Sequence, residues 1–409
     1  MNPAPANLWR NREFNLLWVS QCLSDLGNTI ATLAVPLLIL SSGHSPAQAG
    51  LVGTIGLAVM VLGRLPAGVL VDRTDRRRLM LICDGIRLAA YLALGLMILQ
   101  PGSVTLAGVI AVTVIGSASN ACFGTAEHSA LRTIVANGQL PSAVARNEAR
   151  SYATSLAGPP IGGLLFQIGR SLPFFGNAVT FLLSLIGVAL IRRPLQQPLA
   201  EQPAGHASAL AEGFRFVFGD PFLRAVLLIA APLNFAIQGI IFTIIVTLQR
   251  QNTPPAVIGT VETIVAVGGL LGALAAPTLV LRVRLPVLIR GICWAAAAFM
   301  ACSALLTSSV AAAIPIAAAV FLGPASNAAL FGHQAAITPD RLQGRVVSVV
   351  ITVATSVAAA APLLAGTLIT AWGSSVSILF FAAAVAVSAV AASVSRGIRS
   401  LQPVQELAR

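Results

Sequence analysis

The chain alternates between long apolar stretches and short polar connections over most of its length. A helix needs about 20 mainly apolar residues to cross the ~30 Å hydrocarbon core of a bilayer. A transmembrane β-barrel would instead show short strands of alternating polarity. The pattern therefore predicts an all-α membrane protein with twelve transmembrane helices, over residues 16–40, 49–71, 79–99, 105–123, 152–169, 172–191, 222–248, 257–281, 287–306, 310–331, 346–371 and 376–394.

The longest polar connection, residues 192–221, divides the predicted helices six and six. It begins with a polar, proline-containing stretch and ends with an amphipathic segment, Leu210 to Phe218, which we expect on the inner membrane surface. The hexapeptide GSASNA at 116–121 recurs as GPASNA at 323–328, a weak echo consistent with two six-helix repeats. We therefore predict an N-terminal bundle (1–191), a cytoplasmic linker (192–221) and a C-terminal bundle (222–409).

Composition supports lipid as the main solvent of this chain. Only 9% of the residues are charged, 56% are hydrophobic and the mean hydropathy is +0.87, whereas a soluble domain carries roughly a quarter charged residues. A single water-soluble core stops growing near ~250–300 residues, which is too small for so much apolar surface. The five cysteines lie in apolar stretches without metal-ligand spacing, so we expect buried thiols and no metal or other cofactor.

The basic residues, all 25 of them Arg, indicate the orientation in the membrane. Twenty-one lie in the terminal segments or in every second connection, and only Arg170 and Arg250 lie on the other side. Because positive residues concentrate in cytoplasmic loops, we expect both termini in the cytoplasm. Arg clusters scattered between apolar stretches do not form a nucleic-acid-binding face. No cleavable signal peptide is apparent, so the first helix is expected to remain in the protein.

The connection after the second predicted helix carries a spaced set of Gly, Asp and Arg. Gly68, Asp72, Arg73, Arg76 and Arg77 match the pattern GxxxDRxxRR, which resembles the signature of the major facilitator superfamily at this place. Gly68 would let a neighbouring helix approach. Asp72 would end the helix beside a cationic cluster and form a latch, a contact made in one conformation and broken in another. The alternative is that these arginines only fix the topology.

The fifth predicted helix contains Gly158-Pro159-Pro160-Ile161-Gly162-Gly163, which resembles the GPxxGG motif that in this superfamily accompanies exporters and antiporters. Two prolines remove backbone donors and bend the helix. Glycines such as Gly162 and Gly163 allow close helix contact, and we expect the matching face at Gly268, Gly269 and Gly272 in the eighth helix. The alternative is a general Gly/Pro kink.

Three further segments, 14–28, 213–225 and 338–348, are similar to the branch that includes bacterial macrolide and siderophore (enterobactin-type) exporters. The resemblance covers nearly the whole chain. It implies two pseudo-symmetric six-helix bundles in a bacterial cytoplasmic membrane. One departure concerns the fourth predicted helix, 105–123, which has no Arg, so the basic signature found there in many proton-coupled drug exporters is absent.

Ionisable residues inside predicted helices are costly in lipid and are therefore candidates for function. Asp25 in the first helix and Glu262 in the eighth are the candidate proton or substrate groups, and Arg64 in the second could line a cavity. Asn234 and Gln238 in the seventh could offer neutral hydrogen bonds to a substrate.

Two pairs of neighbouring charged residues stand apart from these candidates. Asp84 and Arg87, three residues apart in the third helix, are expected to neutralise each other as a structural pair. Glu127 and His128 follow the fourth helix, where a role in pH-sensitive chemistry and a loop position are both open.

The resemblance and the residues together predict a secondary transporter and not an enzyme. The expected activity is proton-coupled efflux of a small lipophilic or amphipathic molecule, such as a drug, antibiotic or siderophore, by a monomer using alternating access. The alternatives are an importer or symporter of the same fold, or a lipid flippase or polytopic membrane enzyme. No Walker phosphate loop and no HExxH motif occur in the sequence, and the four His are scattered.

Overall fold

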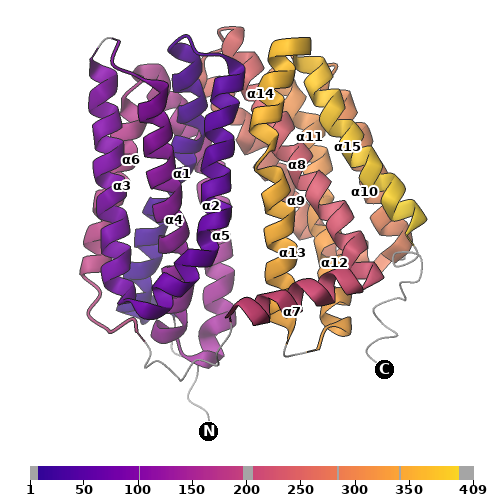
Figure 1. The fold of residues 1–409 in the computed structure, drawn as a ribbon, viewed down its shortest axis with the longest axis horizontal. Coiled ribbons are helices and arrows are strands. Elements are labelled where there is room, and N and C mark those ends of the chain that lie inside the picture. Colours follow the sequence, from indigo (N-terminus) through magenta and orange to yellow (C-terminus); the bar gives the residue numbers. More distant parts are fainter. Residues whose placement is uncertain (1–7, 101, 197–205, 283–284, 340–341, 396–409) are drawn as a thin grey trace. The chain divides into compact units, whose positions relative to one another are not determined.

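The computed structural model describes residues 8–100, 102–196, 206–282, 285–339 and 342–395, and these residues form helices without any strand (Figure 1). The predicted all-α membrane fold is confirmed. The helices of the N-terminal half, including two short 3-10 turns, are η1 (Leu8–Arg10), α1 (Arg12–Ser41), α2 (Pro46–Arg73), α3 (Arg76–Leu99), α4 (Leu106–Ile134), η2 (Asn137–Gln139), α5 (Leu140–Ile168) and α6 (Leu172–Ala189).

The C-terminal half repeats this arrangement of long helices with more interruptions. Its elements are α7 (His206–Gly219), α8 (Pro221–Arg250), α9 (Pro255–Arg282), α10 (Leu285–Ser303), η3 (Val310–Ala312), α11 (Ala313–Phe321), α12 (Gly323–Ile337), α13 (Gln343–Ala358), α14 (Ala361–Trp372) and α15 (Ser374–Val394).

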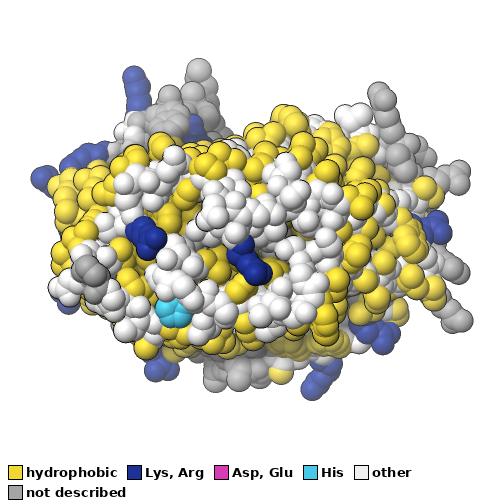
Figure 2. Space-filling model, turned by 90° about the horizontal axis from the view of Figure 1, so that it is seen from above, with side chains coloured by type: hydrophobic (Ala, Val, Ile, Leu, Met, Phe, Trp, Pro, Cys, Tyr) yellow, Lys and Arg dark blue, Asp and Glu magenta, His cyan; other side chains and the backbone are white. Residues whose placement is uncertain are grey.

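Eleven stretches of the described chain are long and apolar enough to cross a membrane. The remaining predicted span, 152–169, lies in α5, which has 29 residues but carries Arg146, Glu148 and Arg150 in its first half. Large hydrophobic side chains are exposed along the spans, and such a surface needs lipid around it. Figure 2 shows the molecule from above, where hydrophobic side chains are mixed with other side chains, backbone and some basic side chains.

Prolines divide the tenth and eleventh predicted spans. Pro324 is the second residue of α12, and Pro362 is the second residue of α14. A proline lacks the N–H that would continue the helix and disfavours helical geometry in the residue before it. The chain therefore stops one helix at Phe321 or Ala358 and starts the next within three residues.

Short polar side chains cap several helices at their first residues. Oδ1 of Asp220 accepts hydrogen bonds from the backbone N–H groups of Phe222 (2.8 Å) and Leu223 (3.0 Å) at the start of α8. Asn11 and Asp75 cap α1 and α3 in the same way. Capping satisfies N–H groups that have no partner within the helix, so these residues fix where each span begins.

The chain folds as two compact units, each packed mainly within itself. The first unit comprises residues 1–44, 55–202 and 254–263, and the second comprises the rest, including 45–54. The first turns of α2 therefore pack with the C-terminal helices, and the first turns of α9 pack with the N-terminal helices. The predicted domain boundaries, 1–191, 192–221 and 222–409, stay a prediction, and residues 197–205 of that linker lie outside the described residues.

The amphipathic end of the predicted linker is the helix α7, which runs across one end of the second unit (Figure 1). Val217 is fully buried among residues of α8 and α13. Glu212 forms an ion pair with Arg345 of α13, and a Cβ atom on Gly213 would lie 3.2 Å from Cβ of the same arginine. This segment is thus a helix that belongs to the C-terminal bundle.

In the first unit, α1 is the most enclosed of the candidate spans, since 56% of the residues in its apolar stretch are buried. Leu33, Ala34 and Leu37 are fully buried, and α1 packs against α4, α5 and α6. A charged side chain on the inner faces of α1 must therefore find its partners on these neighbours.

Candidate functional site

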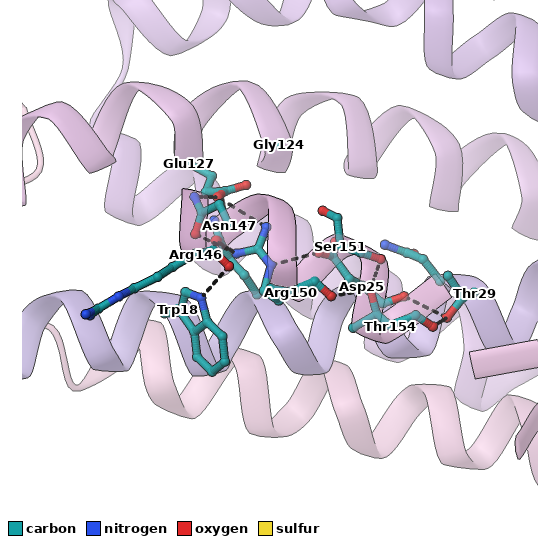
Figure 3. Close-up of polar contacts among 12 residues, drawn as sticks. Trp18, Asp25, Thr29, Gly124, Glu127, Arg146, Asn147, Arg150, Ser151 and Thr154 are labelled. Carbon is teal, nitrogen blue, oxygen red and sulfur yellow. Dashed lines mark hydrogen bonds and ion pairs between the residues drawn. The ribbon is translucent and has the colours of Figure 1, made fainter. Parts of the chain in front are cut away.

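Charged side chains from three helices of the first unit meet beside α1 (Figure 3). Nε of Arg150, on α5, lies 3.1 Å from Oδ2 of Asp25 on α1. Nη2 of the same residue lies 3.5 Å from Oε1 of Glu127 on α4. The side chains of Arg150 and Glu127 are 5% and 7% exposed, whereas that of Asp25 is 35% exposed. Arg150 is therefore enclosed by the protein, whereas the carboxylate of Asp25 is partly exposed at the surface.

Neutral side chains complete this network. Nη1 of Arg150 donates to Oε1 of Gln21, and Nδ2 of Asn147 donates to Oε1 of Glu127 at 3.2 Å. The exposed His128 places Nδ1 3.8 Å from Oε2 of Glu127. With His128 neutral, one guanidinium faces two carboxylates, so the ionised cluster has one uncompensated negative charge. Because burial penalises such a charge, the cluster is suited to accept one proton.

Close packing of α1 against α5 brings Arg150 to Asp25. A Cβ atom on Gly158 would lie 1.9 Å from Oγ1 of Thr29, and one on Gly162 would lie 3.0 Å from the carbonyl oxygen of Ile30. A side chain at Gly158 would overlap that of Thr29, and one at Gly162 would press on the backbone of Ile30, so these glycines allow α1 and α5 to pack closely. Arg150 precedes Gly158 by about two turns, and Asp25 precedes Thr29 by about one.

The other side of the helix-5 motif faces the first turns of α9. A Cβ atom on Gly163 would lie 2.2 Å from the carbonyl oxygen of Pro255, and one on Gly259 would lie 2.4 Å from that of Pro159. The prediction that Gly268, Gly269 and Gly272 form the matching face is wrong. Gly268 and Gly272 lie against the backbone of α11 instead, because only the first turns of α9 pack against α5.

Two arginines of the predicted latch lie at helix C-termini within the first unit. Arg76 Nη1 donates to the carbonyl oxygens of Leu195 (3.0 Å) and Ser129 (3.3 Å), near the end of α4. Arg77 Nε donates to the carbonyl oxygen of Val188 at 3.3 Å, at the end of α6. Val188 lies in the last turn of α6, at the negative end of the helix dipole, so the contact of Arg77 is favourable.

The remaining latch residues lie in or beside the last turns of α2. Asp72 is half-buried and Arg73 is exposed. No atom lies within 4 Å of the place where a Cβ on Gly68 would sit, so the close helix approach expected at this glycine does not occur among the described residues. The role of the five residues as a latch stays a prediction.

Asp84 and Arg87 form an ion pair within α3, and both side chains are 0% exposed. Ser184 Oγ donates to Oδ2 of Asp84 at 2.7 Å, and the guanidinium lies 4.6 Å and 4.3 Å from the ring centroids of Phe123 and Phe181. Aromatic faces attract a cation and exclude water from it. The pairing is as expected, and its structural role stays a prediction.

The other candidates are not part of the network around Arg150. Arg64 on α2 is exposed and Glu262 on α9 is half-buried, and neither makes a hydrogen bond or ion pair to another described residue. Asn234 and Gln238 are exposed on α8, where Nδ2 of Asn234 donates to the carbonyl oxygen of Ala230 at 2.8 Å. Their roles in binding protons or substrate stay predictions.

The sequence pattern missed Arg150, which was assigned to a cytoplasmic connection, and left Glu127 open between a loop and a site. The predicted ends at Phe123 and Tyr152 are wrong, since α4 continues to Ile134 and α5 begins at Leu140. The predicted ends followed from apolarity alone. The polar residues beyond them that face the protein interior were therefore left out of the predicted helices. Pro141 in the first turn of α5 is a helix-start signal that could have extended the span.

Long apolar helices that enclose ionisable groups are typical of polytopic membrane proteins that move ions or small molecules. A sequence profile described as Major Facilitator Superfamily matches residues 17–332. The chain belongs to this family, and it is accordingly a membrane transporter of small molecules and not an enzyme.

Curated relatives of the chain are efflux proteins by name. The multidrug efflux pump Tap of Mycobacterium tuberculosis is 28% identical over 288 residues, which cover 66% of this chain and 66% of that protein. The enterobactin exporter EntS of Escherichia coli is 26% identical over 279 residues, which cover 66% and 64%. The chain thus matches just under two thirds of the length of these relatives.

Among solved structures, a bacterial homolog of the human lysosomal transporter Spinster has a TM-score of 0.74 at 17% identity. The similarity covers 94% of this chain and 96% of that chain. At this identity the likeness supports the fold alone.

Proposed function

We propose that this protein exports a lipophilic or amphipathic small molecule from a bacterial cytoplasm in exchange for protons. It would work as a monomer by alternating access, with both termini in the cytoplasm. The names of the curated relatives, a multidrug efflux pump and an enterobactin exporter, support outward transport. The helix-5 motif, which in this superfamily accompanies exporters and antiporters, supports the same direction.

The observation that carries proton coupling is the sharing of Arg150 by Asp25 and Glu127. When Asp25 is ionised, its carboxylate on α1 binds the guanidinium of Arg150 on α5. When a proton neutralises Asp25 from its open side, the guanidinium is free to pair fully with Glu127 on α4. A proton on one side chain thereby changes the contact between α1 and α5, and that change can be linked to the conformation of the transporter.

Measurement of proton release from energised inside-out vesicles, scanned with lipophilic antibiotics, dyes and siderophores, tests the proposal. A compound that is exchanged for protons should collapse the pH gradient, and empty vesicles should not respond. We expect the response to be lost in Asp25→Asn and in Glu127→Gln.

Glu148→Gln is the matched control, because Glu148 is an exposed acid on α5 only two residues from Arg150. This variant should respond as the wild type does. An undiminished, compound-dependent response in both Asp25→Asn and Glu127→Gln would contradict the proposed coupling site. Accumulation of the compound driven by an inward proton gradient, without export, would favour the importer.

A further inference from the structure

A groove of about 380 Å³ lies on the surface of the first unit between α1 and α6. Arg10 and Arg12 line one part of it, at the N-terminal end of α1. The rest is lined by the polar residues Asn15 and Ser20 and by Leu16, Val19, Leu183 and Gly187. Its size falls in the range of about 300–1,000 Å³ that is usual for small-molecule sites.

Among the described residues, no partner takes up the donors of the two arginines of the groove. Both are exposed, and neither makes a hydrogen bond or ion pair to another described residue. Arg76 and Arg77 in the same unit differ, since their guanidinium groups donate to backbone carbonyls. The nearest acid in sequence, Glu13, accepts a hydrogen bond from the backbone N–H of Arg192 (3.0 Å) and does not line the groove. The groove therefore offers two unused cations to an anionic group.

The apolar part of the groove opens on an exposed hydrophobic surface of α1 and α6. Val19 and Leu183 are 49% and 45% exposed, and Ile186 and Leu190 on α6 are 45% and 48% exposed. The floor is formed where the helices meet, since a Cβ on Gly187 would lie 2.1 Å from Oγ of Ser20. At 1.5 Å per residue, the groove runs about 10 Å along α1 from Arg12 to Val19.

We propose that this groove binds one anionic phospholipid, with its phosphate at Arg10 and Arg12 and an acyl chain along Leu16, Val19 and Leu183. The arginines stand at the N-terminal end of the candidate span α1, which would place them at the level of the lipid headgroups. A basic pocket continuous with an apolar groove between helices matches an anionic amphiphile and not a free phosphate. The site rests on the membrane fold alone and is independent of the proposed transport reaction.

Native mass spectrometry of the purified full-length protein, exchanged between phosphatidylglycerol and phosphatidylcholine, tests the site. The wild type should retain one phosphatidylglycerol in preference to phosphatidylcholine. The double variant Arg10→Gln/Arg12→Gln should lose this preference by roughly 30-fold, because each basic residue contributes a factor of about five near an anionic surface. Val19→Trp should also reduce retention, because it fills the apolar part and leaves both charges.

Matched variants separate this groove from general electrostatic attraction. Arg78→Gln/Arg132→Gln removes two exposed arginines of the same unit outside the groove, and Leu92→Trp enlarges an exposed apolar residue of α3. Both should retain phosphatidylglycerol as the wild type does. Equal loss in both arginine double variants, or no lipid preference in the wild type, would overturn the proposal. Complete displacement of the lipid by inorganic phosphate would show a phosphate site instead and would equally overturn it.

Discussion

Two buried arginines of the first unit have different surroundings, and the difference indicates different roles. Arg150 is shared by two acids, one of which is open to its surroundings. Arg87 has a single acid, Asp84, and is enclosed by two aromatic rings. A cation with two competing partners can change partner at little cost, whereas a sealed pair is stable in one arrangement. This difference supports the coupling role proposed for Arg150 and the structural role predicted for Arg87.

Replacement of Arg87 should destabilise the protein, because Asp84 would remain buried without its counter-charge. For Arg87→Met we expect a loss of about 3–5 kcal/mol, which is the usual cost of breaking a buried ion pair. The double variant Asp84→Asn/Arg87→Met should recover most of this loss. Thermal unfolding in detergent measures both effects. A double variant that is stable but inactive in transport would instead show a functional role for the pair.

At the level of helices, two crossings have the same construction. One joins α5 to the start of α9 in the first unit, and the other joins α14 to the start of α2 in the second. In each, a glycine four residues after a proline faces the carbonyl oxygen of the partner's proline. The distances from the added Cβ are 2.2 Å for Gly163 and Pro255, 2.4 Å for Gly259 and Pro159, 2.2 Å for Gly366 and Pro46, and 2.1 Å for Gly50 and Pro362. The helix-5 motif thus has a counterpart in α14.

A methyl group at either crossing should force the helices apart. We expect Gly163→Ala and Gly366→Ala each to lower stability by about 1–3 kcal/mol, the usual cost of overpacking, and to slow transport. Gly124→Ala in α4 is the control, because no atom lies within 4 Å of its added Cβ. Unfolding curves and transport rates of the three variants check this. Similar behaviour of all three would mean that the crossings tolerate a side chain.

At the scale of the whole molecule, the distribution of arginines predicts which side of the membrane each loop faces. Arg146 and Arg150 were counted among the cytoplasmic loops but lie inside α5. Removing both from the count leaves a large excess on the same side, so the predicted orientation does not change. Residues 283–284, 340–341 and 396–409, which hold some of the counted arginines, lie outside the described residues.

Single cysteines in a cysteine-free background test the orientation. Ala136 lies in the turn after α4 and Gln251 in the turn after α8, and both are exposed. A membrane-impermeant maleimide should label Gln251→Cys in intact cells and Ala136→Cys only after permeabilisation. The reverse pattern would invert the predicted topology.

The amino-acid sequence by itself determined the fold class and the family of this protein, and it located the eleven stretches that are long and apolar enough to cross a membrane. The free energy of placing about 20 apolar residues in lipid is a local property, so it can be summed along the chain without knowing the neighbours. The Gly, Pro and Arg spacing of the second loop and fifth helix is local as well. Asp25 could be recognised as a candidate because an acid within an apolar stretch needs an explanation wherever its partner lies.

Only the tertiary structure decided which residues meet. Gln21 and Arg150 are 129 residues apart in sequence and in contact. Glu127 joins them from the polar end of α4, which lies beyond the apolar stretch that predicted this helix. Polar residues facing the interior make a span look shorter than it is, because an average over the helix does not distinguish faces. The partner of the helix-5 motif was likewise settled by which turns of α9 reach α5, and that crossing depends on how helices pack and not on the composition of either one.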